Sequence, residues 1–118
     1  MKTISKEIDS RYSGCPIRQV ITRIGDKWSM LALYILGKSD KKKMRYSEIH
    51  EYMLDCSQKM LSQTLKNLEK NKLVNRKVYP EVPPRVEYSL TELGRSFLSP
   101  LDALVGWGAD NMYKMIKD

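Results

Sequence analysis

The sequence predicts a mostly helical single domain with one small β-hairpin, in the order helix, helix, short strand, helix, helix, strand, turn, strand, helix. Three observations predict this class. Apolar residues recur at helical spacing over most of the chain, and strand-like alternation is confined to residues 74–90. Three prolines, which cannot donate to a sheet, place a turn inside that stretch. A length of 118 residues fits one domain with one apolar core.

The first two helices are predicted from their boundary residues and apolar faces. Pro16 suits a first helical position, because the N–H that proline lacks has no helical partner there. Gly25 predicts the end of this helix, and Asp26 predicts the N-cap of the next. The second helix, expected over residues 27–36 and ended by Gly37, is apolar nearly all round, as a helix central to a core would be. The first helix has one apolar face, made by Ile17, Val20, Ile21 and Ile24.

A polar loop and a short third helix follow. The loop GKSDKKK, residues 37–43, leads into Met44-Arg45-Tyr46, which predicts a short edge strand. Ser47 then predicts the N-cap of a helix that ends near Leu54. Three residues of this helix are expected to face inward: Ile49, Tyr52 and Met53.

The fourth helix, from Ser57, follows a turn of a few residues and is strongly amphipathic. Leu61, Leu65 and Leu68 share its apolar face, and the opposite face is expected to hold cations and amides but no carboxylate. Two helices joined so tightly, the second with a donor-rich face, indicate a helix-turn-helix motif. Glutamine can read adenine and lysine can read guanine in a major groove, whereas the alternative is a solvated face. The residues expected near DNA are Gln58, Lys59, Ser62, Gln63 and Lys66.

The hairpin after this helix adds cations, which makes it a candidate wing. Its turn is expected near residues 81–85, with one buried face along each strand and Arg85 at the tip. An arginine at such a tip can enter a minor groove or pair with phosphate. The alternative is that Arg85 pairs with Glu81 or Glu87. The other two cations of the candidate wing are Arg76 and Lys77.

Thr91 and Glu92 predict the start of a last helical region over residues 93–117, which Pro100 should kink or split. This region and the first helix offer more apolar face than one small core can bury. A symmetric dimer built from residues about 16–24 and 100–117 is the simplest solution, and it would set two fourth helices roughly 34 Å apart. The alternative is a closed monomer with Trp107 under its own helices. The expected interface residues are Ile17, Val20, Ile21, Leu101, Leu104, Val105 and Met112.

Short motifs give the chain a family resemblance: Cys15-Pro16, residues 24–28 (IGDKW), residues 45–49 (RYSEI) and, most specific, residues 57–94. Over about residues 15–108 the chain resembles the HxlR family of bacterial winged-helix transcriptional regulators, which is related to MarR-like regulators. The resemblance implies a single winged-helix DNA-binding domain over residues 1–118. It also implies a homodimeric, sequence-specific repressor that binds double-stranded DNA at a pseudo-palindromic operator. Asp26 departs from the family, where glycine is common, and should alter only the cap between the first two helices.

Cys15 is expected at the N-cap of the first helix. The positive end of that helix, with Arg11 and Arg18 nearby, favours the thiolate. Some members of the family that the chain resembles sense oxidants or electrophiles through a cysteine at this place, so Cys15 is a redox-sensing candidate. The alternative is an ordinary packed thiol. Cys56 is expected to be structural, or to pair across a dimer.

Composition narrows the function classes. The net charge of +7 and the pI near 9.4 are in the range of nucleic-acid binders. Without zinc-ligand spacing or a glycine-rich phosphate loop, and with His50 expected at the surface, we expect no metal, no cofactor and no enzyme activity. The sequence has no apolar run of about 20 residues and no signal peptide, so we expect a cytoplasmic, nucleoid-associated protein. Residues 1–14 are polar and are expected to form a loose N-terminal arm or a short helix.

Two points about function stay open from the sequence. An effector is compatible with the chain, either a small molecule or an oxidant. The alternative function is a winged-helix module for protein contact without specific DNA binding, which the fold alone does not exclude. Such a module would be expected to show apolar anchors on the fourth helix in place of its lysines.

Overall fold

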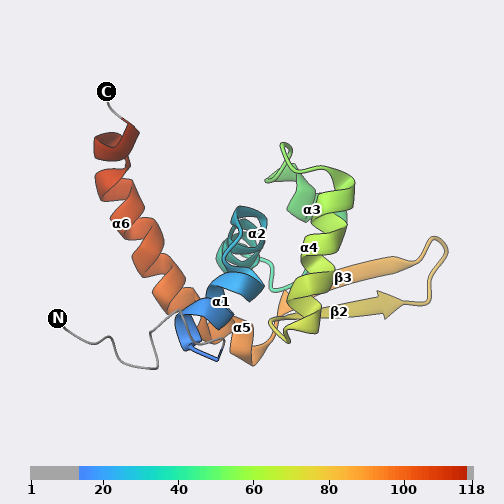
Figure 1. The fold of residues 1–118 in the computed structure, drawn as a ribbon. Helices are drawn as coiled ribbons and strands as arrows, with labels where there is room; N and C mark the ends of the chain where they lie inside the picture. The colour runs from blue at the N-terminus through green and yellow to red at the C-terminus, as the bar shows by residue number, and fades with distance from the viewer. Residues whose placement is uncertain (1–13, 117–118) are drawn as a thin grey trace.

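The computed structural model describes residues 14–116 and has the winged-helix fold expected from the sequence (Figure 1). Arg11 and all but the last residue of the expected N-terminal arm lie outside these residues. None of the helices within residues 14–116 is long and apolar enough to cross a membrane. In chain order the elements are α1 (Pro16–Ile24), α2 (Lys27–Lys38), β1 (Met44–Arg45), α3 (Tyr46–Glu51), α4 (Gln58–Lys70), β2 (Val74–Tyr79), β3 (Arg85–Leu90), α5 (Glu92–Ser96) and α6 (Leu98–Ile116).

The three strands form an antiparallel sheet in the order β1-β3-β2. At its inner end Val74 lies opposite Leu90, and both are buried. Farther out, Val78 lies opposite Val86, and 48% of Val78 is exposed. The expected buried face therefore extends over only the inner part of the hairpin. The outer part projects away from the body of the protein as a wing (Figure 1).

The core is formed mainly by α2 and α4, which pack against each other and against the sheet. The predicted apolar face of α4 is confirmed, because Leu61, Leu65 and Leu68 are each at most 1% exposed. From α2, Ala32 and Leu33 are completely buried. Burial of a leucine side chain is worth roughly 1.5–3 kcal/mol, so these three leucines fix which side of α4 faces solvent.

Gly37 does not end α2 as predicted, because the helix continues to Lys38. A Cβ on Gly37 would collide with the Leu98 side chain of α6. The glycine therefore allows two helices to pack closely. Leu98 lies 61 residues from Gly37 in the sequence, so no local pattern reveals this contact.

The start of α3 also differs from the prediction, because the helix begins at Tyr46 and Ser47 is not its N-cap. The Arg45 N–H donates to Glu48 Oε1 at 2.9 Å, so the glutamate satisfies an otherwise unpaired donor at this end. The helix ends at Glu51. Of the residues expected to face inward, Ile49 and Met53 are buried and Tyr52 is 72% exposed.

The last helical region is split, as Pro100 predicted, but the break falls at Phe97. Pro100 lies in the first turn of α6, where its missing N–H has no helical partner. Thr91 is the N-cap of α5, as expected, and its Oγ1 accepts from the Gly94 N–H at 3.0 Å. After its first turns α6 leaves the body of the protein (Figure 1), and Leu101 is the buried residue among those described in this helix.

Candidate nucleic-acid interface

The start of α4 is held by its own cap and by α3. Ser57 Oγ accepts from the Met60 N–H at 3.0 Å, which caps the helix. The phenol of Tyr46 donates to the Gln58 carbonyl at 2.9 Å, and His50 Nε2 lies 2.9 Å from the Cys56 carbonyl. His50 is therefore a half-buried residue that fastens the α3–α4 turn, and the expectation of a plain surface histidine is wrong.

The outer face of α4 is polar and exposed, and the side chains predicted to lie near DNA make no polar contacts of their own within the protein as described. All five residues predicted to lie near DNA are exposed. Within residues 14–116 none of these five side chains makes a hydrogen bond or an ion pair. Their donors therefore remain available to another molecule. The five are Gln58, Lys59, Ser62, Gln63 and Lys66.

One carboxylate lies on this side, contrary to the prediction. Glu69 lines the groove between α4 and the wing, together with Ser62, Lys66 and Arg76. Glu69 follows Lys66 by three residues and Ser62 by seven, so helical spacing could have placed it there. With two cations against one carboxylate, the groove stays net positive.

Arg85 is not at the tip of the wing. It starts β3 opposite Tyr79, its Cζ lies 4.0 Å from the centre of the Tyr79 ring, and its Nε lies 3.4 Å from Glu81 Oε2. The alternative pairing with Glu81 is thus the one observed. Residues 80–84 form the tip, where Val82 is fully exposed. The other wing cations, Arg76 and Lys77, are exposed, and Lys77 Nζ lies 4.9 Å from the centre of the Tyr79 ring.

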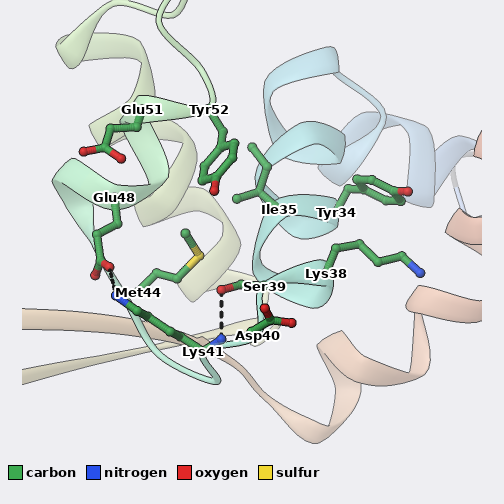
Figure 2. A pocket seen from close by; sticks show the side chains of 10 residues that line it. All are labelled: Tyr34, Ile35, Lys38, Ser39, Asp40, Lys41, Met44, Glu48, Glu51 and Tyr52. Carbon is green, nitrogen blue, oxygen red and sulfur yellow. Dashed lines mark hydrogen bonds and ion pairs between the residues drawn. The ribbon is translucent and has the colours of Figure 1, made fainter.

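The basic loop between α2 and β1 has part of its charge paired within the protein. Figure 2 shows Lys41 reaching Glu48, with its Nζ 2.6 Å from Glu48 Oε2, and the Lys41 N–H donating to Ser39 Oγ at 3.1 Å. The hydrogen bond from Lys41, followed by that from the Arg45 N–H, lowers the pKa of Glu48. These contacts hold the loop against α3, beside a hollow of about 500 Å³.

The predicted interface residues are exposed apolar side chains, with one exception. Leu101 is 2% exposed and packs in the core of its own chain, so it is not part of an exposed face. Trp107 is 56% exposed, which contradicts the alternative of a closed monomer with this side chain covered. We name the remaining residues of α1 and α6, with Trp107, the end-helix surface: Ile17, Val20, Ile21, Leu104, Val105, Trp107 and Met112.

Both thiols are free and buried. Cys15 is the N-cap of α1, as predicted, and its Sγ accepts from the Arg18 N–H at 3.4 Å. Arg11, the other cation expected nearby, lies outside the described residues. Cys56 is 1% exposed in the core, and burial, followed by the nearby Asp55 carboxylate, raises the pKa of its thiol.

Comparisons with known proteins match this architecture. Residues 23–115 match the family model described as HxlR-like helix-turn-helix. An uncharacterized HTH-type transcriptional regulator of Methanothermobacter thermautotrophicus is 45% identical over 115 residues, which cover 90% of this chain and 86% of that protein.

Two solved structures are also similar. One is a transcriptional regulator from Porphyromonas gingivalis W83 assigned to the MarR family, with a TM-score of 0.79 and 35% identity over 93% of this chain and 99% of the other. The second is the redox regulator HypR in its oxidized form, with a TM-score of 0.75 and 36% identity over 82% of this chain and 97% of the other.

Proposed function

The chain belongs to the HxlR-like helix-turn-helix family of transcriptional regulators, and from this premise we propose that it binds a pseudo-palindromic operator as a homodimer and represses transcription. The observation that carries the proposal is the outer face of α4. This face presents lysine, glutamine and serine donors that are exposed and make no bond within the described residues. Buried leucines on the opposite side keep that face turned to solvent.

The N-terminal part of α4 enters the major groove in this proposal. Gln58 and Gln63 then read adenine edges, and Lys59 and Lys66 contact guanine or phosphate. The wing lies beside the adjacent backbone, where Arg76 and Lys77 pair with phosphates. Arg85 reaches DNA only with the part of its guanidinium that Glu81 and Tyr79 leave open.

The homodimer is supported by the end-helix surface. Its residues come from the two ends of the chain, and most are about half exposed in the single chain. Exposed apolar surface of this extent is usually covered by a partner. A second copy, related to the first by a two-fold axis, covers the exposed faces of α1 and α6. The same axis places the two α4 helices of the dimer against the two half-sites of the operator.

We also propose that Cys15 makes the repressor responsive to oxidants or electrophiles. Two observations support this role. Cys15 is the N-cap of α1, a helix that contributes to the end-helix surface, and the chain is 36% identical to HypR, a redox regulator. Modification of Sγ removes the acceptor of the Arg18 N–H and so loosens the first turn of α1. Diamide treatment should change operator binding of the wild type and not of Cys15→Ser; identical responses of the two would exclude this role.

The DNA-reading role is tested with Gln63→Ala. On an operator selected from random DNA, we expect an affinity loss of roughly tenfold, because a good base contact is worth about 1–3 kcal/mol. Affinity for unrelated DNA should not change, because phosphate contacts dominate non-specific binding. Equal losses on both DNAs, or none on either, would contradict base reading by this face.

A further inference from the structure

A cleft of about 340 Å³ lies where α1, the end of α4 and the α5–α6 junction meet. Its volume is in the range of small-molecule sites. Ile24 and Leu73 are each 7% exposed, so the apolar lining continues into the core. The apolar lining residues are Val20, Ile24, Leu73, Leu93, Phe97 and Pro100.

Arg23 is the one charged residue that lines this cleft among the described residues. Its Nε donates to Gln19 Oε1 at 3.3 Å, and its Nη1 donates to Asn71 Oδ1 at 3.1 Å. Both acceptors are neutral amides, and within residues 14–116 no carboxylate pairs with this guanidinium. The amides therefore orient the guanidinium without neutralising it.

The contact of Arg23 with the C-terminal end of α4 does not neutralise the charge of its guanidinium. Asn71 is the C-cap of α4, so the guanidinium lies near the negative end of that helix. A helix C-terminus carries only about half an elementary charge, spread over its last turn. The cleft thus combines an apolar lining with an oriented cation and contains no carboxylate of its own.

We propose that this cleft binds a small amphipathic anion, an aromatic or branched aliphatic carboxylate. The carboxylate pairs with Arg23, whose planar fork suits two carboxylate oxygens. The apolar part of the ligand packs against Ile24, Leu73 and Phe97. A neutral or cationic compound of the same shape makes the apolar contacts but cannot form the ion pair with Arg23.

The cleft joins the end-helix surface to the recognition helix. The Arg23 carbonyl accepts from Asn67 Nδ2 at 2.8 Å, and Asn71 Nδ2 donates to the Asn67 carbonyl at 2.9 Å. A ligand on Arg23 therefore touches α1 and the bonds that hold the end of α4. Its effect on operator affinity rests on the function proposed above, and linkage requires the ligand and DNA to change each other's affinity by one factor.

Binding is measured first without DNA, by amide NMR on the full chain. The probe is 1-naphthoate, with 1-naphthylmethanol and 1-naphthylmethylammonium as neutral and cationic controls. We expect 1-naphthoate to shift the amides of Ile24, Leu73 and Phe97 and to bind about fivefold more tightly than the alcohol, as an exposed ion pair allows. Arg23→Gln should abolish this preference, Arg23→Lys should keep part of it, and Arg95→Gln, which removes a cation outside the cleft, should keep all of it.

Three outcomes would overturn the proposal: no shifts at the cleft with millimolar 1-naphthoate, equal affinities for the three compounds, or binding only by a dissociated chain. The last outcome would assign the cleft to a second copy. A second titration, of operator DNA with and without 1-naphthoate at matched ionic strength, separates the two proposals. Cleft binding without any effect on DNA would refute the coupling alone, whereas loss of all specific DNA binding would refute the proposed function and leave the anion site standing.

Discussion

The phenol of Tyr46 donates a hydrogen bond to the carbonyl of Gln58 at 2.9 Å, so the first residue of α3 holds the first residue of α4. Tyr46→Phe removes only this donor. We expect the free energy of unfolding to fall by about 0.5–1 kcal/mol, as for an ordinary hydrogen bond, with weaker operator binding. Urea unfolding and DNA titration measure both effects. Tyr113→Phe, on exposed α6, is the control, and equal effects of the two substitutions would contradict the link.

Lys66 is exposed beside the groove between α4 and the wing and has no partner among the described residues. If it pairs with a phosphate, Lys66→Gln lowers the slope of log K against log salt concentration by about 0.9, the value for one phosphate contact. Operator titrations at several salt concentrations give the slope. Lys114→Gln, on α6, removes the same charge away from DNA and should leave the slope unchanged. An unaltered slope in Lys66→Gln would remove Lys66 from the interface.

Glu81 holds Arg85 against Tyr79 and so limits the reach of the one arginine of β3. Glu81→Gln keeps the size of the side chain and removes its negative charge. We expect tighter operator binding, by up to about fivefold, because an exposed ion pair is worth at most about 1 kcal/mol. Arg85→Ala should weaken operator binding, and the double variant should match Arg85→Ala alone. If Glu81→Gln tightens binding equally with and without Arg85, the gain is only the loss of a repulsive charge.

Glu48 gives the fold a predictable pH dependence. Its pKa is lowered from the ordinary 4.5 by Lys41 first and by the Arg45 N–H second. The stabilisation is therefore present above pH 4.5 and is lost as pH falls through the lowered folded-state pKa. Glu48→Gln keeps an acceptor for the Arg45 N–H and loses the ion pair with Lys41. We therefore expect its free energy of unfolding to be lower than that of the wild type by about 0.5 kcal/mol at pH 7, and equal to it in strong acid. If the two proteins differ in free energy of unfolding by the same amount at pH 7 and in strong acid, the ion pair is not the origin of the difference.

The sequence predicted most of what local chemistry controls. Asp26 and Thr91 are N-caps, as expected, because a cap needs only a side-chain acceptor and the next backbone N–H groups. The polar face of α4 followed from helical spacing. The Cys15 N-cap followed from the proline beside it.

The predictions that the structure contradicts concern residues whose positions depend on tertiary contacts or on how far the core extends. The helix end predicted at Gly37 is wrong because the glycine packs against Leu98, which is distant in the sequence. Leu101 shares the apolar period of α6 with Leu104 and Val105, yet it lies early enough in the helix to be buried in the core, whereas the two later side chains are exposed. The Arg23–Asn71 hydrogen bond joins residues 48 positions apart, so no local pattern contains it.

In the proposed complex, two chains read one operator through their α4 helices. The most direct measurement selects bound fragments from random DNA and then determines the mass of the complex by light scattering. We expect an enriched sequence with two-fold symmetry, half-sites about 34 Å apart, and two 13.8 kDa chains on each DNA. Enrichment of no sequence, or one chain on one unsymmetrical site, would contradict the proposed complex.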